Sequence, residues 1–470
     1  MYSTMDAFAQ TRQDILGAQS AVYKIQWPTR LAVFTCWIVF AAAGIYFPLT
    51  VGAALFSIGF LNYVFLLSFR ISNNFFSKPP TLHNEVPKEA RRWPTFSLLV
   101  PLKHEDEVIH ATLQAIEALE YPKHLVQVII VVEETDMLTR RSLSTLTLPD
   151  YFQLLLIPEL PPYTKGRALL HALPIATGQY LAVYDAESRP EASQLRKAAL
   201  ALVQANGPTC FQAKISISNA SSSWISRQFA GEYSEWYERH MSALSAQGLP
   251  FGLGGNSFFL ARAELEKAGA WDPFNVTEDA DLSVRLVEQG VKLRLLESIT
   301  TESCPETVVG WTNQRTRWNK GLFITQLVHL RRTLLRGGFG TEGWCSFWMP
   351  MMSAAVIPFF NLYIPFYMGM SRLPYSAILL MSVSLWLLLG FNLGCSWVIN
   401  VKTYRRLGIH RSSFGVLSDS FFYLFLHLGA GFKAYFEYFL APMHWHKTEH
   451  VEQEKPKLQV ASLETQFSLT

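Results

Sequence analysis

The sequence is poor in charged residues, and the shortage is concentrated in a few stretches. Asp, Glu, Lys and Arg make up 16% of the 470 residues, against about 25% in ordinary soluble proteins. None of the four occurs in residues 31–69, 343–371 or 373–401. Each stretch is longer than the ~20 residues that a helix needs to cross a bilayer. The sequence therefore predicts an integral membrane protein with one helical hairpin at 31–70 and a second at 343–401.

Cysteine is also scarce, and several familiar patterns are missing. The five cysteines are scattered and form neither a CxxC pair nor a Cys/His cluster, so nothing indicates a zinc site or a disulfide framework. There is no Walker-type loop, heptad pattern or internal repeat. The polar first 30 residues and the long apolar segment after them do not fit a signal peptide. The net charge of +3 says little about partners, and we expect no nucleic acid among them.

Lysine and arginine are unevenly distributed around the apolar stretches. They cluster after residues 31–69 and after residues 373–401, whereas the turn around Pro48 has none. Because cationic loops stay in the cytoplasm, this asymmetry places the chain ends and the middle of the chain there. We therefore expect a multi-pass protein of the inner (plasma) membrane.

The expected organisation follows these boundaries. It comprises a cytoplasmic segment at 1–30, two transmembrane helices at 31–70, a linker at 71–94, a soluble domain at 95–321, an interfacial helix at 322–342, two transmembrane helices at 343–401, a basic loop and a further helix at 402–442, and a cytoplasmic tail at 443–470. The charges within residues 413–442 (Asp419, His427, Lys433 and Glu437) favour an interfacial or re-entrant helix over a lipid-facing span.

Between about residues 95 and 321, strand patterns alternate with helix patterns. The apolar runs FSLLVPL, VQVIIVVEE, YFQLLLIPE and GQYLAVYDAE predict four buried strands. A segment with helical spacing separates the first two and ends at Pro122. This alternation indicates an α/β domain with a largely parallel sheet that is covered on both faces. Ligands of such sheets bind beyond the carboxyl ends of the strands, where the acidic residues of this domain collect.

Four clusters of polar residues stand out in this domain. They are Glu133, Glu134 and Asp136 after the second strand, Asp185 and Glu187 after the fourth, FGLGGNS followed by Thr277, Glu278 and Asp279 at a helix start, and TNQRTRWNKG at 312–321. Each alone has a plainer interpretation, because acidic residues are common turn formers and N-caps, and glycines permit positive φ angles. An acidic first turn also simply complements the helix dipole. The four together, in this order beside a membrane, indicate a site.

The last cluster has a defined helical face. Gln314, Arg317 and Trp318 have the spacing i, i+3, i+4, which places them on one face of a helix while Arg315 points elsewhere. Taken alone, the stretch favours a basic helix on a membrane surface with an aromatic anchor. The other three clusters reverse that preference.

With these clusters the sequence resembles the family-2 processive glycosyltransferases, the membrane group that includes bacterial cellulose and hyaluronan synthases. The resemblance covers about residues 95–330. Residues 277–279 match the TED motif of that family, and 314–318 match its Q-x-x-R-W motif. Residues 185–187 and 133–136 stand at its D-x-D and early acidic motifs, with glutamates where aspartates are usual. The resemblance implies a GT-A-type, mostly parallel α/β domain in the cytoplasm, inserted between transmembrane hairpins.

The resemblance also implies roles for individual residues. It assigns the catalytic base to Asp279, a Mg²⁺ or Mn²⁺ ion to Asp185 and Glu187, the donor nucleotide to Glu133, Asp136, Lys165, Asp185 and Arg317, and the acceptor to Gln314, Trp318, Glu278 and Gly255. Carboxylates suit such an ion, which stabilises a leaving diphosphate, and one carboxylate suffices as the base for direct inversion. Glu278 and Asp281 are rivals for the base, but we expect them to point away from it, because successive helical residues differ by about 100°.

Two further segments each have two open interpretations. Lys165 and Gly166 match a position where a basic loop approaches the nucleotide, and a solvated lysine is an equal alternative. Near the C-terminus, HWHKTEH resembles the gating loop of cellulose synthase in type and place, but it is also typical of a juxtamembrane anchor at Trp445. Its histidines, His444 and His446, make an incomplete metal site.

The function predicted from these features is membrane-bound, inverting transfer of sugar from a nucleotide-sugar, first of all a UDP-sugar, to a growing polysaccharide. The alternative is transfer of a single sugar to a lipid-linked acceptor. A transporter with a soluble domain that only senses a nucleotide-sugar is disfavoured, because the apolar stretches carry no charged residue. Four apolar spans and one doubtful segment make a thin conduit, so export would require a partner or a homodimer.

Overall fold

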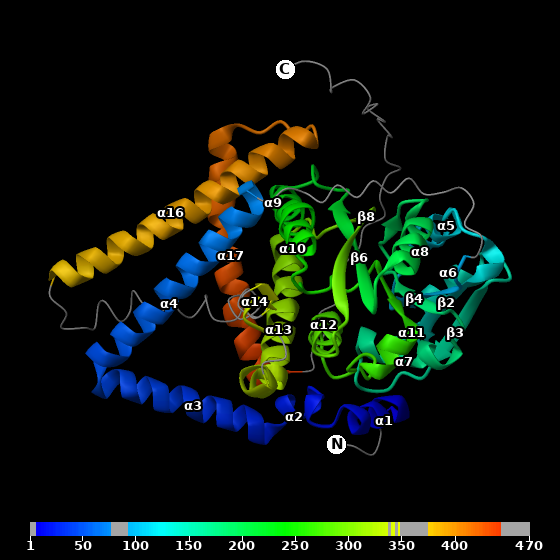
Figure 1. The fold of residues 1–470 in the computed structure, drawn as a ribbon, viewed down its shortest axis with the longest axis horizontal. Coiled ribbons are helices and arrows are strands. Elements are labelled where there is room, and N and C mark those ends of the chain that lie inside the picture. The colour runs from blue at the N-terminus through cyan, green and yellow to red at the C-terminus, as the bar shows by residue number, and fades with distance from the viewer. Residues whose placement is uncertain (1–5, 77–92, 337–339, 344–345, 348–374, 443–470) are drawn as a thin grey trace.

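The computed structural model describes residues 6–76, 93–336, 340–343, 346–347 and 375–442. An α/β domain makes up the centre, and the long helices α4, α16 and α17 lie to one side of it (Figure 1). Most of the predicted linker, the first arm of the second predicted hairpin, and the tail with His444, Trp445 and His446 fall outside the described residues.

The described strands form one eight-stranded sheet in the order β3-β2-β1-β4-β7-β6-β8-β5. They are β1 Phe96–Leu102, β2 Val126–Glu133, β3 Phe152–Ile157, β4 Tyr180–Val183, β5 Arg189–Pro190, β6 Thr209–Ile217, β7 Phe258–Ala261 and β8 Lys292–Glu302. Strands β1 to β4 pair in parallel, which confirms the four predicted strands and the mostly parallel sheet. Strand β7 is antiparallel to β4 and β6, and β8 runs parallel to β6.

The helices cover the sheet and extend beyond it. They are α1 Ala7–Leu16, α2 Val22–Ile25, α3 Trp27–Tyr46, α4 Pro48–Ile71, α5 Ile109–Glu117, α6 Met137–Ser144, α7 Lys165–Ala172, α8 Gln194–Gln204, α9 Trp224–Tyr233, α10 Met241–Gln247, α11 Arg262–Lys267, α12 Glu278–Glu288, α13 Val308–Arg336, α14 Gly340–Gly343, α16 Tyr375–Arg406 and α17 Ser413–Leu440. Two π-helical segments, η2 Ser72–Phe76 and η5 Ser234–His240, and 3₁₀ turns at Gly17–Gln19, Lys123–Leu125 and Leu173–Ile175 complete the described elements.

The sheet is buried on both faces, which explains the continuous apolar runs in its central strands. Neighbouring residues of β1 belong to different cores: Leu99 packs with α7, α10 and α12, whereas Leu98 packs with α5 and α8. Successive side chains of a strand point to opposite faces, so a strand between two helical layers needs an apolar residue at nearly every position. The expected covering of both faces is confirmed.

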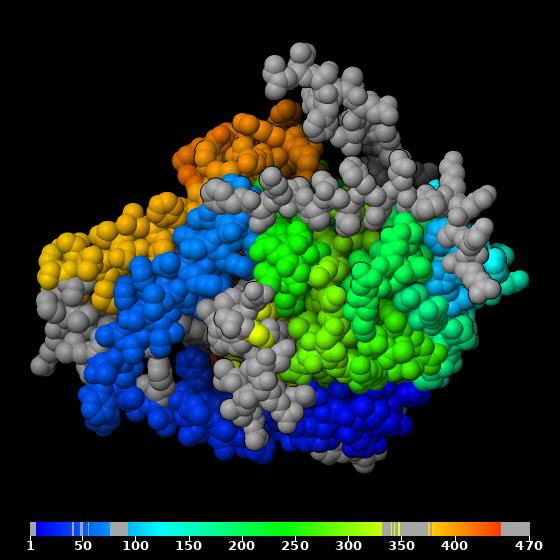
Figure 2. All heavy atoms as spheres, viewed as in Figure 1, coloured from blue at the N-terminus to red at the C-terminus, as the bar shows by residue number. Residues whose placement is uncertain are grey.

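The N-terminal segment before the first apolar helix packs on the α/β domain (dark blue in Figure 2). Asp6 caps α1 and forms ion pairs with Arg167 and His171 of α7, and the ring of Phe8 lies 4.3 Å from that of His171. Residues 1–30 were expected to form a separate cytoplasmic segment, and this contact was not predicted from the sequence.

Among the described residues, four helical segments are long and apolar enough to cross a membrane: Trp27–Tyr46, Thr50–Phe75, Ile378–Arg406 and Ser413–Leu440. Pro48 occupies the first turn of α4, where its missing N–H costs no hydrogen bond, and it separates α4 from α3 as expected. The fourth segment differs from the others, because 39% of its apolar window is buried within the protein, against at most 6% in the first three.

Helix α17 is packed along α13, and its charged residues contact protein groups. Glu437 pairs with Lys320 at 3.0 Å, and Lys433 donates to Asn313 Oδ1 at 2.6 Å. Helix α13 itself is continuous across the boundary predicted at residue 321, so the predicted end of the α/β domain and the predicted interfacial helix share one element. Glu437 and Lys433 of α17 are therefore directed toward α13.

Candidate active site

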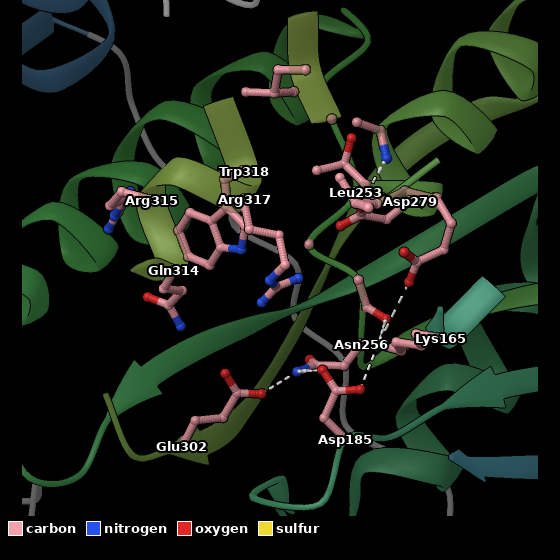
Figure 3. Close-up of a pocket in the computed structure, with 18 of the residues that line it drawn as sticks. Lys165, Asp185, Leu253, Asn256, Asp279, Glu302, Gln314, Arg315, Arg317 and Trp318 are labelled. Carbon is pink, nitrogen blue, oxygen red and sulfur yellow. Dashed lines mark hydrogen bonds and ion pairs between the residues drawn. The ribbon is translucent and has the colours of Figure 1, made fainter. Parts of the chain in front are cut away.

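A cavity of about 680 Å³ lies where the carboxyl ends of β1, β2 and β4 meet α12 and α13. All four polar clusters contribute to its lining, through Glu133, Asp185, Glu187, Gly255, Glu278, Asp279, Gln314, Arg317 and Trp318. Figure 3 shows Asp185, Asn256 and Lys165 facing the α13 residues across this space. The structure thus brings together residues that lie up to about 180 positions apart in the chain.

The proposed base, Asp279, is the second residue of α12 and lines the cavity. Burial raises the pKa of its carboxyl group, although the Ala280 N–H, Lys165 and Arg317 act in the opposite direction. The Ala280 N–H donates to Asp279 Oδ1 at 2.8 Å. The N-terminal position on the helix favours the ionised form, but the cost of burial outweighs it.

The two rivals of Asp279 have different surroundings. Asp281 is fully buried, pairs with Arg285 at 2.6 Å and His329 at 2.7 Å, and points away from the cavity as expected. Glu278 lines the cavity beside Asp279, contrary to that expectation. Burial raises the pKa of Glu278 to about 7, with Lys165 opposing the shift and Asp279 adding to it. Two carboxyl groups of one helix turn therefore reach the same space.

Lys165 is a cation that lies among the acidic residues Asp185, Glu278 and Asp279 of the cavity. Its Nζ forms an ion pair with Asp185, donates to the carbonyl of Gly255 at 2.7 Å and lies 3.9 Å from Glu278. Burial by itself lowers the pKa of this amine, but Asp185, Glu278 and Asp279 raise it above its ordinary value. Lys165 is therefore a partly buried cation in the wall of the cavity, and it is paired with Asp185.

A third carboxylate, which the sequence analysis missed, faces Asp185 and Glu187. Glu302 is the last residue of β8, and Asn256 donates its amide to Glu302 and, at 3.4 Å, to Asp185 Oδ2. Burial raises the pKa of Glu302 well above its ordinary value, and the charges of Glu187 and Asp185 add to the effect. The available signal was an acidic residue at the end of a strand, the same signal that identified Asp185.

The donor set at this point suits a hard divalent cation. Carboxylate oxygens are the ligands that Mg²⁺ and Mn²⁺ prefer, and the crowded negative charge of Asp185, Glu187 and Glu302 is what a cation would relieve. The described residues contain no group of three or more His, Cys, Asp or Glu side chains arranged to hold a metal ion. Asp185 and Glu187 would therefore need oxygens of the donor to complete the coordination.

The early acidic cluster divides in the structure. Glu133 lines the cavity and pairs with Lys103 at 2.9 Å and with Arg167. Asp136 is 2% exposed, caps α6 by accepting from the Thr139 N–H at 3.2 Å, and is not among the described residues that line the cavity. The carboxylate of Asp136 also accepts the backbone N–H of His104 at 2.6 Å, so its contacts fit the plainer interpretation of an N-cap that also holds the loop after β1.

Helix α13 carries the Q-x-x-R-W residues over the cavity. Gln314, Arg317 and Trp318 line it, as their spacing predicts. Arg315 also lines the cavity, although its spacing predicted that it points elsewhere; it lies on the far side of the Trp318 ring in Figure 3, where it pairs with Glu232 at 2.7 Å. Gly255 approaches from the other wall with φ +80°, and a Cβ atom there would lie 2.9 Å from Asp279 Oδ2. A left-handed backbone and a close contact with the proposed base therefore both require glycine at 255.

Comparison with known proteins identifies the domain that holds this cavity. Residues 94–321 match the family model described as "Glycosyltransferase like family 2". This part of the chain, just under half of its length, is similar to the glycosyltransferase domains of family 2. The predicted α/β domain with a mostly parallel sheet is confirmed, and the match supports the prediction of a transferase. The match does not extend to the processive, synthase-like type of the family.

Two named proteins are similar to this chain in sequence. The domain region is 27% identical over 273 residues to a probable glycosyltransferase, YdaM, of Bacillus subtilis (54% of this chain, 63% of the relative). It is 26% identical over 289 residues to a beta-monoglucosyldiacylglycerol synthase of Nostoc (60% of each chain). The matched regions span about three fifths of the length of these relatives.

Among solved structures, the chain is similar to the mannosyltransferase PcManGT from Pyrobaculum calidifontis, which was solved in complex with GDP-Man and Mn²⁺. That match has a TM-score of 0.47 and 16% sequence identity, and covers 76% of this chain and 97% of the other.

Proposed function

We propose that the protein transfers a single sugar from a nucleotide-sugar to a hydroxyl group of a membrane lipid, with inversion at the anomeric carbon. The sequence alone favours a growing polysaccharide as the acceptor and leaves this reaction as the alternative. The two acceptors differ in what the cavity must accommodate: a glycan is polar along its whole length, whereas a lipid is polar at one end only.

The observation that carries this proposal is that the lining of the cavity changes from acidic to apolar along its length. Its acidic end is formed by Asp185, Glu278 and Asp279, whereas Leu66 and Phe69 of α4, a candidate membrane span, line it elsewhere. A cavity with a polar end and an apolar wall from a membrane helix suits an amphiphile, because apolar surface is removed from water on both partners. The beta-monoglucosyldiacylglycerol synthase relative is named for a lipid product of this kind.

The residues of the cavity supply the parts that such a transfer needs. Asp279 would accept the proton of the acceptor hydroxyl while its oxygen bonds to the anomeric carbon and the bond from that carbon to the diphosphate breaks. Lys165 and Arg317 place positive charge near the leaving diphosphate. A divalent ion held by Asp185 and Glu187, Mg²⁺ or Mn²⁺, would add to that charge when bound.

The remaining assignments are proposals about binding. Glu133 lies at the carboxyl end of β2 in the cavity wall, which supports a place beside the donor nucleotide. Gln314, Trp318, Glu278 and Gly255 would surround the acceptor hydroxyl. The ring of Trp318 also offers a flat surface for a sugar, and this favours a glycan acceptor as the second candidate.

The contacts of the apolar helices support a membrane arrangement. Arg70 at the end of α4 forms an ion pair with Glu235 of η5, which ties the end of the α3–α4 hairpin to the α/β domain. Tyr423 in the middle of α17 and Glu437 near its C-terminal end contact Glu232 and Lys320 of that domain. Since α17 contacts the α/β domain from its middle to its C-terminal end, we propose that α17 lies along the surface of the membrane while α3, α4 and α16 cross it. The catalytic domain would face the cytoplasm of an inner (plasma) membrane.

The test is a matrix of donors and acceptors in proteoliposomes. UDP- and GDP-sugars are each combined with diacylglycerol-containing vesicles, with an oligosaccharide acceptor or with neither, and nucleotide release and product mass are measured. We expect one donor to yield a lipid that carries a single added sugar. A product that grows into long chains, with no singly glycosylated lipid at low conversion, would instead establish a polysaccharide synthase.

A further inference from the structure

We propose that Arg315, a position that the Q-x-x-R-W motif leaves unspecified, is a positioning residue that fixes the ring of Trp318 for the acceptor. The inference rests on the proposed function in one respect, namely that Trp318 contacts the acceptor. Glu302, the other cavity residue that was not predicted from the sequence, belongs with Asp185 and Glu187 to the group of carboxylates described above.

Arg315 lies among three aromatic rings. Its guanidinium carbon is 4.4 Å from the ring centre of Trp318, 4.8 Å from that of Phe229 and 5.4 Å from that of Trp311. A guanidinium group is planar and stacks on aromatic faces, which the compact ammonium group of lysine cannot do in the same way. One side of the Trp318 ring is thus in contact with a flat cation.

The plane of that cation is itself fixed. Both terminal nitrogens of Arg315 donate to Glu232 of α9, at 2.7 and 2.8 Å, and the side chain of Arg315 is 9% exposed. Such a two-point contact defines the orientation of the guanidinium as well as its position. Burial alone raises the pKa of Glu232, but Arg315 and its other partners lower it below its ordinary value, so the carboxylate stays charged.

Glu232 has further contacts that hold it in place. It accepts the Tyr423 hydroxyl of α17 at 2.6 Å, and Tyr423 in turn accepts the Trp311 indole N–H at 3.0 Å. The chain of contacts therefore joins α9, α13 and α17 behind Trp318. A simple structural ion pair would need only the contact between Arg315 and Glu232; the stacking on Trp318 adds a route to the acceptor site.

The first experiment compares Arg315→Lys with wild type. Lysine keeps the charge but loses both the two-point bond and the flat face. With the acceptor that wild type uses, we expect the KM for that acceptor to rise about tenfold, equivalent to about 1.4 kcal/mol, while the KM for the donor stays within about twofold. The matched control is Arg411→Lys: Arg411 also makes a two-point contact, with Asp419 at 3.2 and 3.0 Å, but does not line the cavity. We expect that variant to behave as wild type.

The second experiment asks whether Arg315 acts through Trp318. In a Trp318→Ala background, Arg315→Lys should cause no further rise in the acceptor KM, because the group that it positions is gone. An equal rise in both backgrounds would show that Arg315 acts independently and would overturn the proposal. Equal losses for donor and acceptor in the single variant would indicate collapse of α13 and would also overturn it.

A second variant and a parallel measurement on wild type cover the cases in which Arg315→Lys does not fold or the acceptor is not a lipid. If Arg315→Lys does not fold, Glu232→Gln removes the charge of the partner at constant size and should give the same selective rise in acceptor KM. The wild-type acceptor panel is measured in parallel. A wild type that glycosylates only oligosaccharides would contradict the proposed lipid acceptor, and the same pair of variants then tests Arg315 with that oligosaccharide.

Discussion

Gly321 of α13 packs so closely on Thr277, the residue before α12, that a Cβ atom at position 321 would lie 2.4 Å from Thr277 Cγ2. The helix that carries Trp318 and the helix that carries Asp279 therefore meet at a contact where any side chain at position 321 would force Thr277 to shift. This contact sets the separation between the proposed acceptor surface and the proposed base.

Replacing Gly321 by alanine should push the two helices apart. Overpacking of this kind typically costs about 1–3 kcal/mol, so we expect Gly321→Ala to lower the thermal unfolding temperature in detergent and to reduce transfer more than nucleotide binding. Gly390→Ala in α16 is the matched control, because a Cβ there meets no atom within 4 Å and alanine is the better helix former. Wild-type transfer by Gly321→Ala would show that the contact can relax without consequence.

Asp279→Asn tests the proposed base, because it keeps the size of the side chain and removes its charge. A general base typically contributes about 10²–10⁴-fold in rate, so we expect a loss of that order in transfer with nucleotide binding retained. Initial rates and equilibrium binding of the nucleotide check the two halves of this prediction.

The control is Asp150→Asn, which changes an exposed carboxylate on a loop and should leave both properties as they are. If Asp279→Asn binds nucleotide and transfers within about threefold of wild type, the base is another residue. Glu278, which lines the same cavity, is then the next to replace.

Chelation tests the proposed divalent ion. EDTA should abolish transfer, and Mg²⁺ or Mn²⁺ should restore it, because Asp185 and Glu187 offer the oxygen ligands that these ions prefer. Asp185→Asn should raise the concentration of ion needed for half-maximal rate, measured by titration into metal-free enzyme. Full activity in metal-free buffer would show that Lys165 and Arg317 suffice for the leaving diphosphate.

The strands and the clusters at their ends could be predicted because each depends on local sequence. A strand buried on both faces requires a continuous apolar run, and polar residues that follow parallel strands meet at one edge, as Glu133 and Asp185 do. The spacing of Gln314, Arg317 and Trp318 likewise defines a helical face without any tertiary information.

Features that depend on contacts between distant segments could not be predicted. The pairing of Arg315 with Glu232 joins residues 83 positions apart, and nothing in either segment indicates the other. The charges of α17 argued against a span in lipid, but their partners on α13 were not apparent from the sequence. The raised pKa of Asp279 could not be predicted for the same reason: the helix terminus, which favours the ionised carboxylate, is visible in the sequence, whereas burial is not.

The raised pKa values of Asp279 and Glu278 lead to a prediction about pH. A base must be ionised, so activity should be lost as the pH falls through the folded-state pKa of Asp279, which burial places above the ordinary aspartate value of 3.8. The charge of Asp279 adds to the raised pKa of Glu278, whereas Glu278 is not among the groups that shift the pKa of Asp279. Asp279 therefore ionises first, while Glu278, with a pKa of about 7, is still neutral and places no negative charge beside it. Glu278→Gln should then leave the acidic limb of the pH profile of kcat/KM in place, as should the control, Glu288→Gln, at the last residue of the same helix and outside the cavity. A limb that moves to lower pH in Glu278→Gln would mean that Glu278 is charged when Asp279 titrates, and a limb that disappears together with the activity would mean that Glu278, rather than Asp279, is the base.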